Sequence, residues 1–138
     1  MINKIILCLD FDGVILDSTR ECIFVAIEAF RQFNQDFDNN LSDNQIKCLK
    51  KLRPMVRGAS EYLKAIDIAL NNINIKTYYD FSNYDISNKY TNKELDVYKK
   101  LFYEKRKLLI KNNPIKWFEL HDFYQSFIIF LKEFINYQ

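Results

Sequence analysis

The chain has 138 residues, of which 49% are hydrophobic and 28% are charged, and its formal net charge is +2. This composition is typical of one folded, soluble domain and excludes a disordered chain, while the scarcity of Gly and Pro excludes a collagen-like one and favours helical or mixed structure. The near balance of charge gives none of the positive excess that nucleic acids or membrane surfaces attract, so we expect neither as a partner.

The first predicted element is a strand over residues 4–11. It is a continuous apolar run rich in Ile and Leu, which is typical of a strand buried on both faces in a parallel sheet. Gly13 follows it and permits a tight turn. No later segment supplies an obvious neighbour. We therefore expect that the strand pairs with a second copy of the chain, that helices cover it, or that the isolated chain is poorly soluble, and self-association is one outcome.

Helices are predicted for most of the remaining chain. Three segments have the Ser/Thr-x-x-Glu/Gln spacing of a capping box, and they begin at Ser18, Ser42 and Thr91. Apolar residues at helical spacing predict helices over residues 19–34, from Ser42 to Pro54, and over residues 58–72, 91–112 and 123–136. Residues 73–90 give no clear pattern, and residues 115–120 form a short segment of undetermined type.

The cysteines and the N-terminus predict a cytoplasmic protein. Cys8, Cys22 and Cys48 are odd in number and lack paired spacing, which is not the pattern of a disulfide framework. Reduced thiols are the rule in the cytoplasm. The apolar run before Asp10 is too short for a signal peptide.

Two carboxylates carry the chemistry that the sequence predicts. Asp10 and Asp12 stand two residues apart at the carboxyl end of the predicted strand, where ligands bind in open α/β sheets. Two neighbouring carboxylates stay ionised most easily around a hard cation such as Mg²⁺. One carboxylate can then attack a phosphoryl group, and the other can transfer a proton to the leaving oxygen.

Residues 9–18, Leu-Asp-Phe-Asp-Gly-Val-Ile-Leu-Asp-Ser, resemble motif I of the haloacid dehalogenase (HAD) superfamily. The resemblance implies that Asp10 is the nucleophile, which forms an aspartyl-phosphate, and that Asp12 is the general acid/base. It also implies a magnesium site made by the Asp10 carboxylate and the Asp12 backbone carbonyl. A second aspartate implies phosphate chemistry, because carbon–halogen cleavage has no leaving oxygen to protonate.

The resemblance implies an α/β lineage, with a HAD-like Rossmannoid core and a helical cap. This chain itself would be predominantly α-helical with one buried N-terminal strand. Residues 1–17 would be the first core strand and flap, residues 18–112 the helical cap, and residues 113–138 the return segment and a helix of the core. We expect the rest of the core to be absent, and no position is assigned as the phosphate-binding Ser or Thr, the catalytic Lys or the distal acidic pair.

Arg53 and Arg57 flank Pro54 in the expected cap and are candidate substrate-binding residues. Arginine binds phosphate or carboxylate through two parallel hydrogen bonds, and a cap that faces Asp10 could use both residues in this way. The alternative is that they are solvated or pair with Glu61.

These features together predict an Mg²⁺-dependent hydrolase, a phosphatase that acts on a small phosphorylated metabolite through Asp10 and Asp12. Two alternatives stay open. The chain could be a truncated, catalytically incomplete HAD-like protein or fragment with a binding role. It could also be a HAD-type phosphotransferase or mutase, which would use the same aspartate pair.

Overall fold

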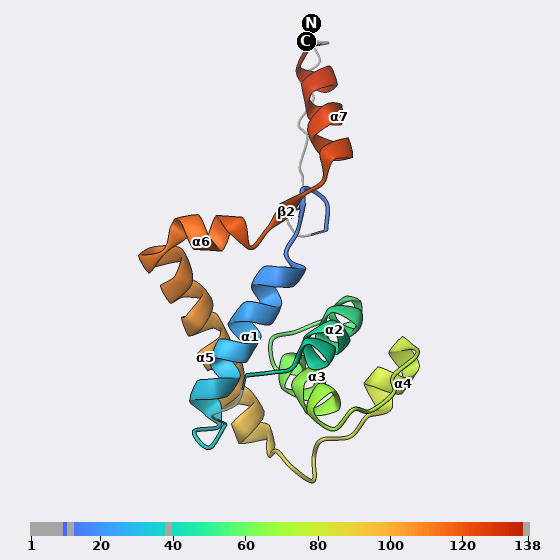
Figure 1. Ribbon diagram of the computed structural model, residues 1–138, viewed down its shortest axis with the longest axis vertical. Helices are drawn as coiled ribbons and strands as arrows, with labels where there is room; N and C mark the ends of the chain where they lie inside the picture. The colour runs from blue at the N-terminus through green and yellow to red at the C-terminus, as the bar shows by residue number, and fades with distance from the viewer. Residues whose placement is uncertain (1–9, 11–12, 38–39, 137–138) are drawn as a thin grey trace, which may run out of the picture.

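The computed structural model describes residues 10, 13–37 and 40–136, and these residues are predominantly helical (Figure 1). The elements in chain order are β1 (Leu16–Asp17), α1 (Thr19–Phe33), α2 (Asp43–Leu52), a 3₁₀ turn (Arg53–Met55), α3 (Glu61–Leu70), α4 (Tyr78–Asn83), α5 (Asn92–Asn112), α6 (Pro114–Glu119), β2 (Asp122–Phe123) and α7 (Gln125–Asn136). The helical character predicted for this chain is confirmed. The predicted strand over residues 4–11 lies outside the described residues, apart from Asp10.

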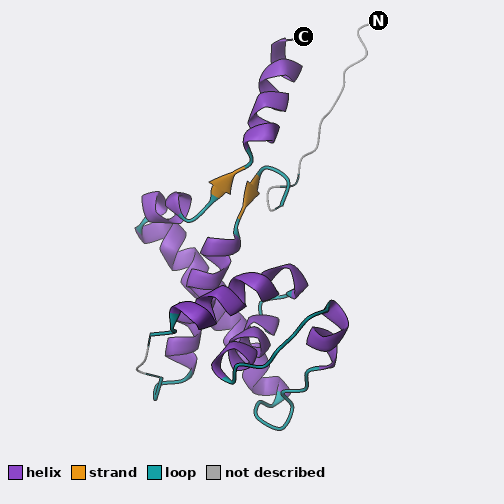
Figure 2. Cartoon of the chain, turned by 45° about the vertical axis from the view of Figure 1, so that its right-hand side comes forward, coloured by secondary structure: helices purple, strands orange, loops and turns teal. Residues whose placement is uncertain are grey.

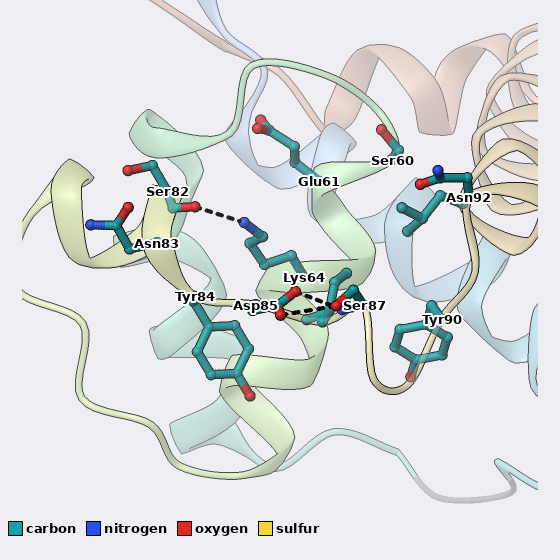
Figure 3. Close-up of a pocket in the computed structure, with 12 residues that line it drawn as sticks. Ser60, Glu61, Lys64, Ser82, Asn83, Tyr84, Asp85, Ser87, Tyr90 and Asn92 are labelled. Carbon is teal, nitrogen blue, oxygen red and sulfur yellow. Dashed lines mark hydrogen bonds between the residues drawn. The ribbon is translucent and has the colours of Figure 1, made fainter.

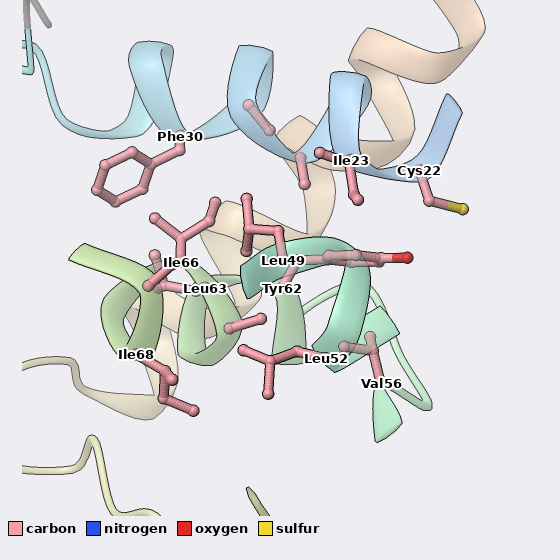
Figure 4. Close-up of a cluster of buried hydrophobic side chains, with 14 of the residues drawn as sticks. Cys22, Ile23, Phe30, Leu49, Leu52, Val56, Tyr62, Leu63, Ile66 and Ile68 are labelled. Atoms are coloured by element: carbon pink, nitrogen blue, oxygen red, sulfur yellow. The ribbon is translucent and has the colours of Figure 1, made fainter. Parts of the chain in front are cut away.

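Helix α1 is the centre of the helical body, which we define as residues 19–121. It packs along α5 on one side and against α2 and α3 on the other. Figure 4 shows the buried cluster between α1, α2 and α3, which includes Ile23, Phe30, Leu49, Leu63 and Ile66. The apolar positions that recur at helical spacing in the sequence therefore form one shared core.

A short pair of strands joins the two ends of the helical body. Leu16 of β1 lies opposite Phe123 of β2, and Asp17 lies opposite Asp122, in an antiparallel pair that we call the neck. Gly13 has φ +78°, and its N–H donates to the Leu16 carbonyl at 2.8 Å, so the turn predicted at this glycine is confirmed. The chain thus enters and leaves the helical body at one place.

Helix α7 extends from the neck on the side opposite the helical body (Figures 1 and 2). Seven of its twelve residues are apolar, and Ile129, Phe130 and Ile135 are exposed among the described residues. The described residues include no helix that is long and apolar enough to span a membrane.

Two of the three predicted capping boxes are confirmed, at Ser42 and Thr91. A further box was missed in the stretch that gave no clear pattern. The Thr77 hydroxyl accepts from the backbone N–H of Asp80, and the Asp80 carboxylate accepts from the backbone N–H of Thr77. This box starts α4, so residues 78–83 are helical.

The capping box predicted at Ser18 is wrong. The carboxylate of Asp17 accepts from the Thr19 N–H at 2.8 Å and replaces the Ser18 side chain at the helix start. Glu21 cannot reach back to the cap, because its side chain turns into the protein and pairs with Arg106.

Three boundaries also differ from the predictions. The helix expected over residues 58–72 is limited to α3, and residues 115–120 belong mostly to α6. The last helix begins at Gln125, because residues 122–123 form β2.

We expect Tyr98→Phe to lower the free energy of unfolding by about 1 kcal/mol. Tyr98 is fully buried, and its hydroxyl donates to the Ala26 carbonyl at 3.0 Å, which links α5 to α1. Urea unfolding followed by circular dichroism measures the change. Tyr103→Phe is the matched control on the same helix, because Tyr103 is 51% exposed. Equal stability of the two variants would contradict this assignment.

We expect the cap of α5 to lose its contribution to stability in acid. Bonds from the Thr91 backbone N–H and hydroxyl hold the pKa of Glu94 below its usual value. The folded state therefore binds the proton less readily than the unfolded state does, and stability falls as the pH falls through that lowered pKa. Glu94→Gln should destabilise the protein at pH 7 and much less at pH 3, measured by urea unfolding. Glu104→Gln, an exposed change on the same helix, should show no such pH dependence.

Candidate functional site

The structure describes Asp10 and does not describe Asp12. Asp10 is exposed and precedes the turn at Gly13, so its carboxylate lies close to the neck in the chain. An exposed carboxylate is accessible to a phosphoryl group and suits an oxygen-preferring cation such as Mg²⁺. Over residues 10, 13–37 and 40–136 no group of three or more acidic, His or Cys side chains could hold a metal ion. The further ligands of a magnesium ion would come from outside these ranges, Asp12 among them, or from water.

A small cavity in the helical body brings both predicted arginines together with a third one. Its volume is about 120 Å³, and its walls include Arg53, Arg57 and Arg106. None of the described residues that line it is acidic. We call this the arginine cavity, and its guanidinium groups suit an anion.

The arginine cavity lies at the end of the helical body that is nearest the neck. Cys22 lines it, and the Cys22 N–H donates to the Ser18 carbonyl at 2.9 Å, which closes the first turn of α1. The strand β1 ends one residue before Ser18. The cavity is therefore about one helical turn from the neck.

Glu61 does not pair with the guanidinium of Arg57, so of the two alternatives to substrate binding only the solvated one agrees with the structure at this residue. Its carboxylate accepts from the backbone N–H groups of Arg57 and Gly58, so it fixes the loop before α3. The Arg57 guanidinium lies 5.4 Å from the centre of the Tyr78 ring, and the residue is exposed. The side chain of Arg57 is therefore accessible to a ligand at the cavity.

Arg106 is held by a buried carboxylate. Its Nε donates to Oε1 of Glu21 at 2.8 Å and its Nη2 donates to Oε2, and the Glu21 side chain is only 1% exposed. The same Nη2 lies 3.2 Å from the Cys22 sulfur. A bidentate pair of this kind fixes the plane of the guanidinium.

Tyr62 adds a neutral donor to the cavity. Its ring stacks on Phe102 with centroids 5.2 Å apart, and its hydroxyl is buried beside the Cys22 thiol. Within the described part of the chain this hydroxyl has no oxygen or nitrogen partner. Burial raises the pKa of Tyr62, so the hydroxyl keeps its proton at neutral pH and can donate it to an anion.

A larger cavity, of about 510 Å³, lies between α3, residues 82–87 and the start of α5 (Figure 3). Lys64 and Asp85, which line it, already form hydrogen bonds that stabilise the fold. Lys64 donates to the carbonyls of Phe81 and Ser82, and Asp85 accepts from the backbone and hydroxyl of Ser87. We therefore centre the candidate site on Asp10 and the arginine cavity.

Sequence reasoning found Arg53 and Arg57 but missed Arg106 as a cavity residue. The sequence contains a signal for Arg106. This residue lies four positions after Phe102 and three before Leu109, which is on the apolar face of the helix. A charged residue at such a position needs a buried partner, and Glu21 is that partner.

Comparisons with known proteins give no relative for this chain: no family model, no curated protein and no solved structure matches it.

We expect Arg106→Met to lower the free energy of unfolding by about 3 kcal/mol or more, because it leaves the buried Glu21 carboxylate without its counter-ion. The double variant Glu21→Leu with Arg106→Met should recover most of this loss, since an apolar pair replaces the buried charges. Urea unfolding gives both values. The control is Arg31→Met, which removes an arginine from a surface pair. An Arg106→Met protein as stable as this control would contradict a structural role for the buried pair.

Proposed function

We propose that the chain is a HAD-like phosphatase, a cytoplasmic, Mg²⁺-dependent hydrolase of a small phosphorylated metabolite that acts through Asp10 and Asp12. The observation that carries the proposal is the neck. A cap inserted directly after motif I must begin and end at one place. The pairing of Leu16 with Phe123, just after the Asp10 segment, supports such an insertion.

The proposed reaction uses the two aspartates in turn. The Asp10 carboxylate attacks phosphorus, the ester P–O bond breaks, and Asp12 gives its proton to the leaving oxygen. Water then attacks the aspartyl-phosphate at phosphorus and gives a proton to Asp12, which restores Asp10 and releases phosphate. Bound to the Asp10 carboxylate and the Asp12 backbone carbonyl, Mg²⁺ would screen the charge of the phosphoryl oxygens.

The helical body corresponds to the proposed cap. The sequence places the end of the cap at residue 112, where α5 ends. Helix α6 continues to pack against α5, and β2 follows it. This packing favours an end at residue 121, with β2 and α7 as the return to the core.

A second candidate function is binding without turnover, in a catalytically incomplete HAD-like protein. The arginine cavity favours it, because its guanidinium groups suit an anion whether or not turnover follows. The phosphate-binding Ser or Thr, the Lys and the distal acidic pair are, in contrast, assigned to no position. A phosphotransferase or mutase would use the same aspartates and would pass the phosphoryl group to a second substrate instead of water.

We expect this chain to hydrolyse para-nitrophenyl phosphate in the presence of Mg²⁺, and Asp10→Asn to lower the rate roughly a thousandfold. Release of nitrophenolate and of inorganic phosphate are both measured, because phosphate transferred to an added alcohol would identify a transferase. Asp36→Asn is the matched control, since it makes the same change at an exposed position between α1 and α2.

The absence of turnover at any protein concentration would reject the phosphatase proposal for this chain. Turnover that survives Asp10→Asn would reject Asp10 as the nucleophile.

A further inference from the structure

We propose that the substrate carries a second anionic group in addition to its phosphate, either a carboxylate or another phosphoryl group, and that Arg53, Arg57 and Tyr62 bind it in the arginine cavity. This inference rests on the proposed function, because it assigns the cavity to the same molecule on which Asp10 acts. It goes further by naming the substrate class.

The charge of the cavity is the first argument. Three arginines line it, and no acidic side chain does among the described lining residues. Arg106 already engages Glu21 through two hydrogen bonds, so it forms a fixed wall. Arg57 is exposed, and Glu61 fixes its backbone by accepting a hydrogen bond from its N–H. Guanidinium groups match the planar geometry of carboxylates and phosphates.

The Tyr62 hydroxyl is the second and independent argument. The residue is 5% exposed, and its hydroxyl has no oxygen or nitrogen partner in the described part of the chain. Its neighbour is the Cys22 thiol, and sulfur is a weak acceptor, so an anionic oxygen in the cavity would be a stronger partner for this buried donor. Figure 4 shows Tyr62 and Cys22 at the same end of the buried cluster, next to the start of α1.

The size and place of the cavity are the third argument. The cavity has a volume of about 120 Å³, whereas a site that holds a whole small molecule has a volume of roughly 300 Å³ or more. The cavity therefore suits one end of a ligand. It is about one helical turn from the neck, and Asp10 lies on the other side of the neck in the chain. The neck thus lies between Asp10 and the cavity in the chain, and a substrate that binds at both places must reach past the neck.

Binding of three phosphonates to the full chain tests this inference without any turnover. Phosphonoacetate carries a carboxylate as its second group, methylenediphosphonate carries a second phosphoryl group, and ethylphosphonate carries none. Isothermal titration calorimetry in metal-free buffer should show at least one of the first two binding roughly tenfold more tightly than ethylphosphonate. The tighter of the two identifies the second group.

Arg57→Gln should remove most of this preference, and Arg57→Lys should restore only part of it, because lysine keeps the charge and loses the paired donors. Tyr62→Phe should weaken the same two probes and leave ethylphosphonate unchanged. Arg31→Gln is the control, since Arg31 lies in the last turn of α1 and pairs with Glu28. Circular dichroism verifies that each variant is folded.

Equal affinity for all three phosphonates would overturn the inference, and so would a preference that survives both Arg57→Gln and Tyr62→Phe. These results are separate from the outcome of the phosphatase assay. A preference that depends on Arg57, found in a chain without turnover, would support the anion site and reject the phosphatase. Turnover without any preference would reject the second anionic group alone.

Discussion

Glu21 and Arg106 are 85 residues apart in the sequence, and their ion pair joins the first turn of α1 to the C-terminal half of α5. The neck consists of strands of only two residues each, which are too short to hold the ends of the helical body by themselves. The buried pair and the packing of α1 along α5 therefore keep the two ends together. The same pair fixes one wall of the arginine cavity, so both the neck and the cavity depend in part on it.

The helices could be predicted because their signals are local. Apolar residues at helical spacing and the boxes at Ser42 and Thr91 depend on residues three or four positions apart, and α1, α2 and α5 agree closely with the predicted ranges. The capping box predicted at Ser18 does not form, because Glu21 makes a tertiary contact instead. Glu21 has the spacing for a cap, but its attraction to Arg106 on a distant helix is stronger. Local spacing cannot show which of two partners a carboxylate chooses.

The neck and the cavity could not be predicted for the same reason. Nothing near Leu16 indicates that Phe123 lies beside it, because a pair of two-residue strands has too little sequence pattern. Arg53 and Arg57 were found from residue type alone. Arg106 and Tyr62 join them only because α3 and α5 pack against α1, which brings three separate segments to one end of the body.

Among the described residues, the buried hydrophobic core lies on one side of the neck only, in the helical body. In the helical body, side chains such as Leu63, Ile66 and Ile68 are completely buried. In α7, beyond the neck, Ile129 and Ile135 are exposed over more than half of their surface. The apolar face of an amphipathic α-helix is normally covered by other elements of the fold. Ile115 and Phe118 of α6 are exposed to a similar degree, so α7 differs from the helical body in that none of its described residues belongs to the buried core. This difference supports the proposed division of the chain at the neck.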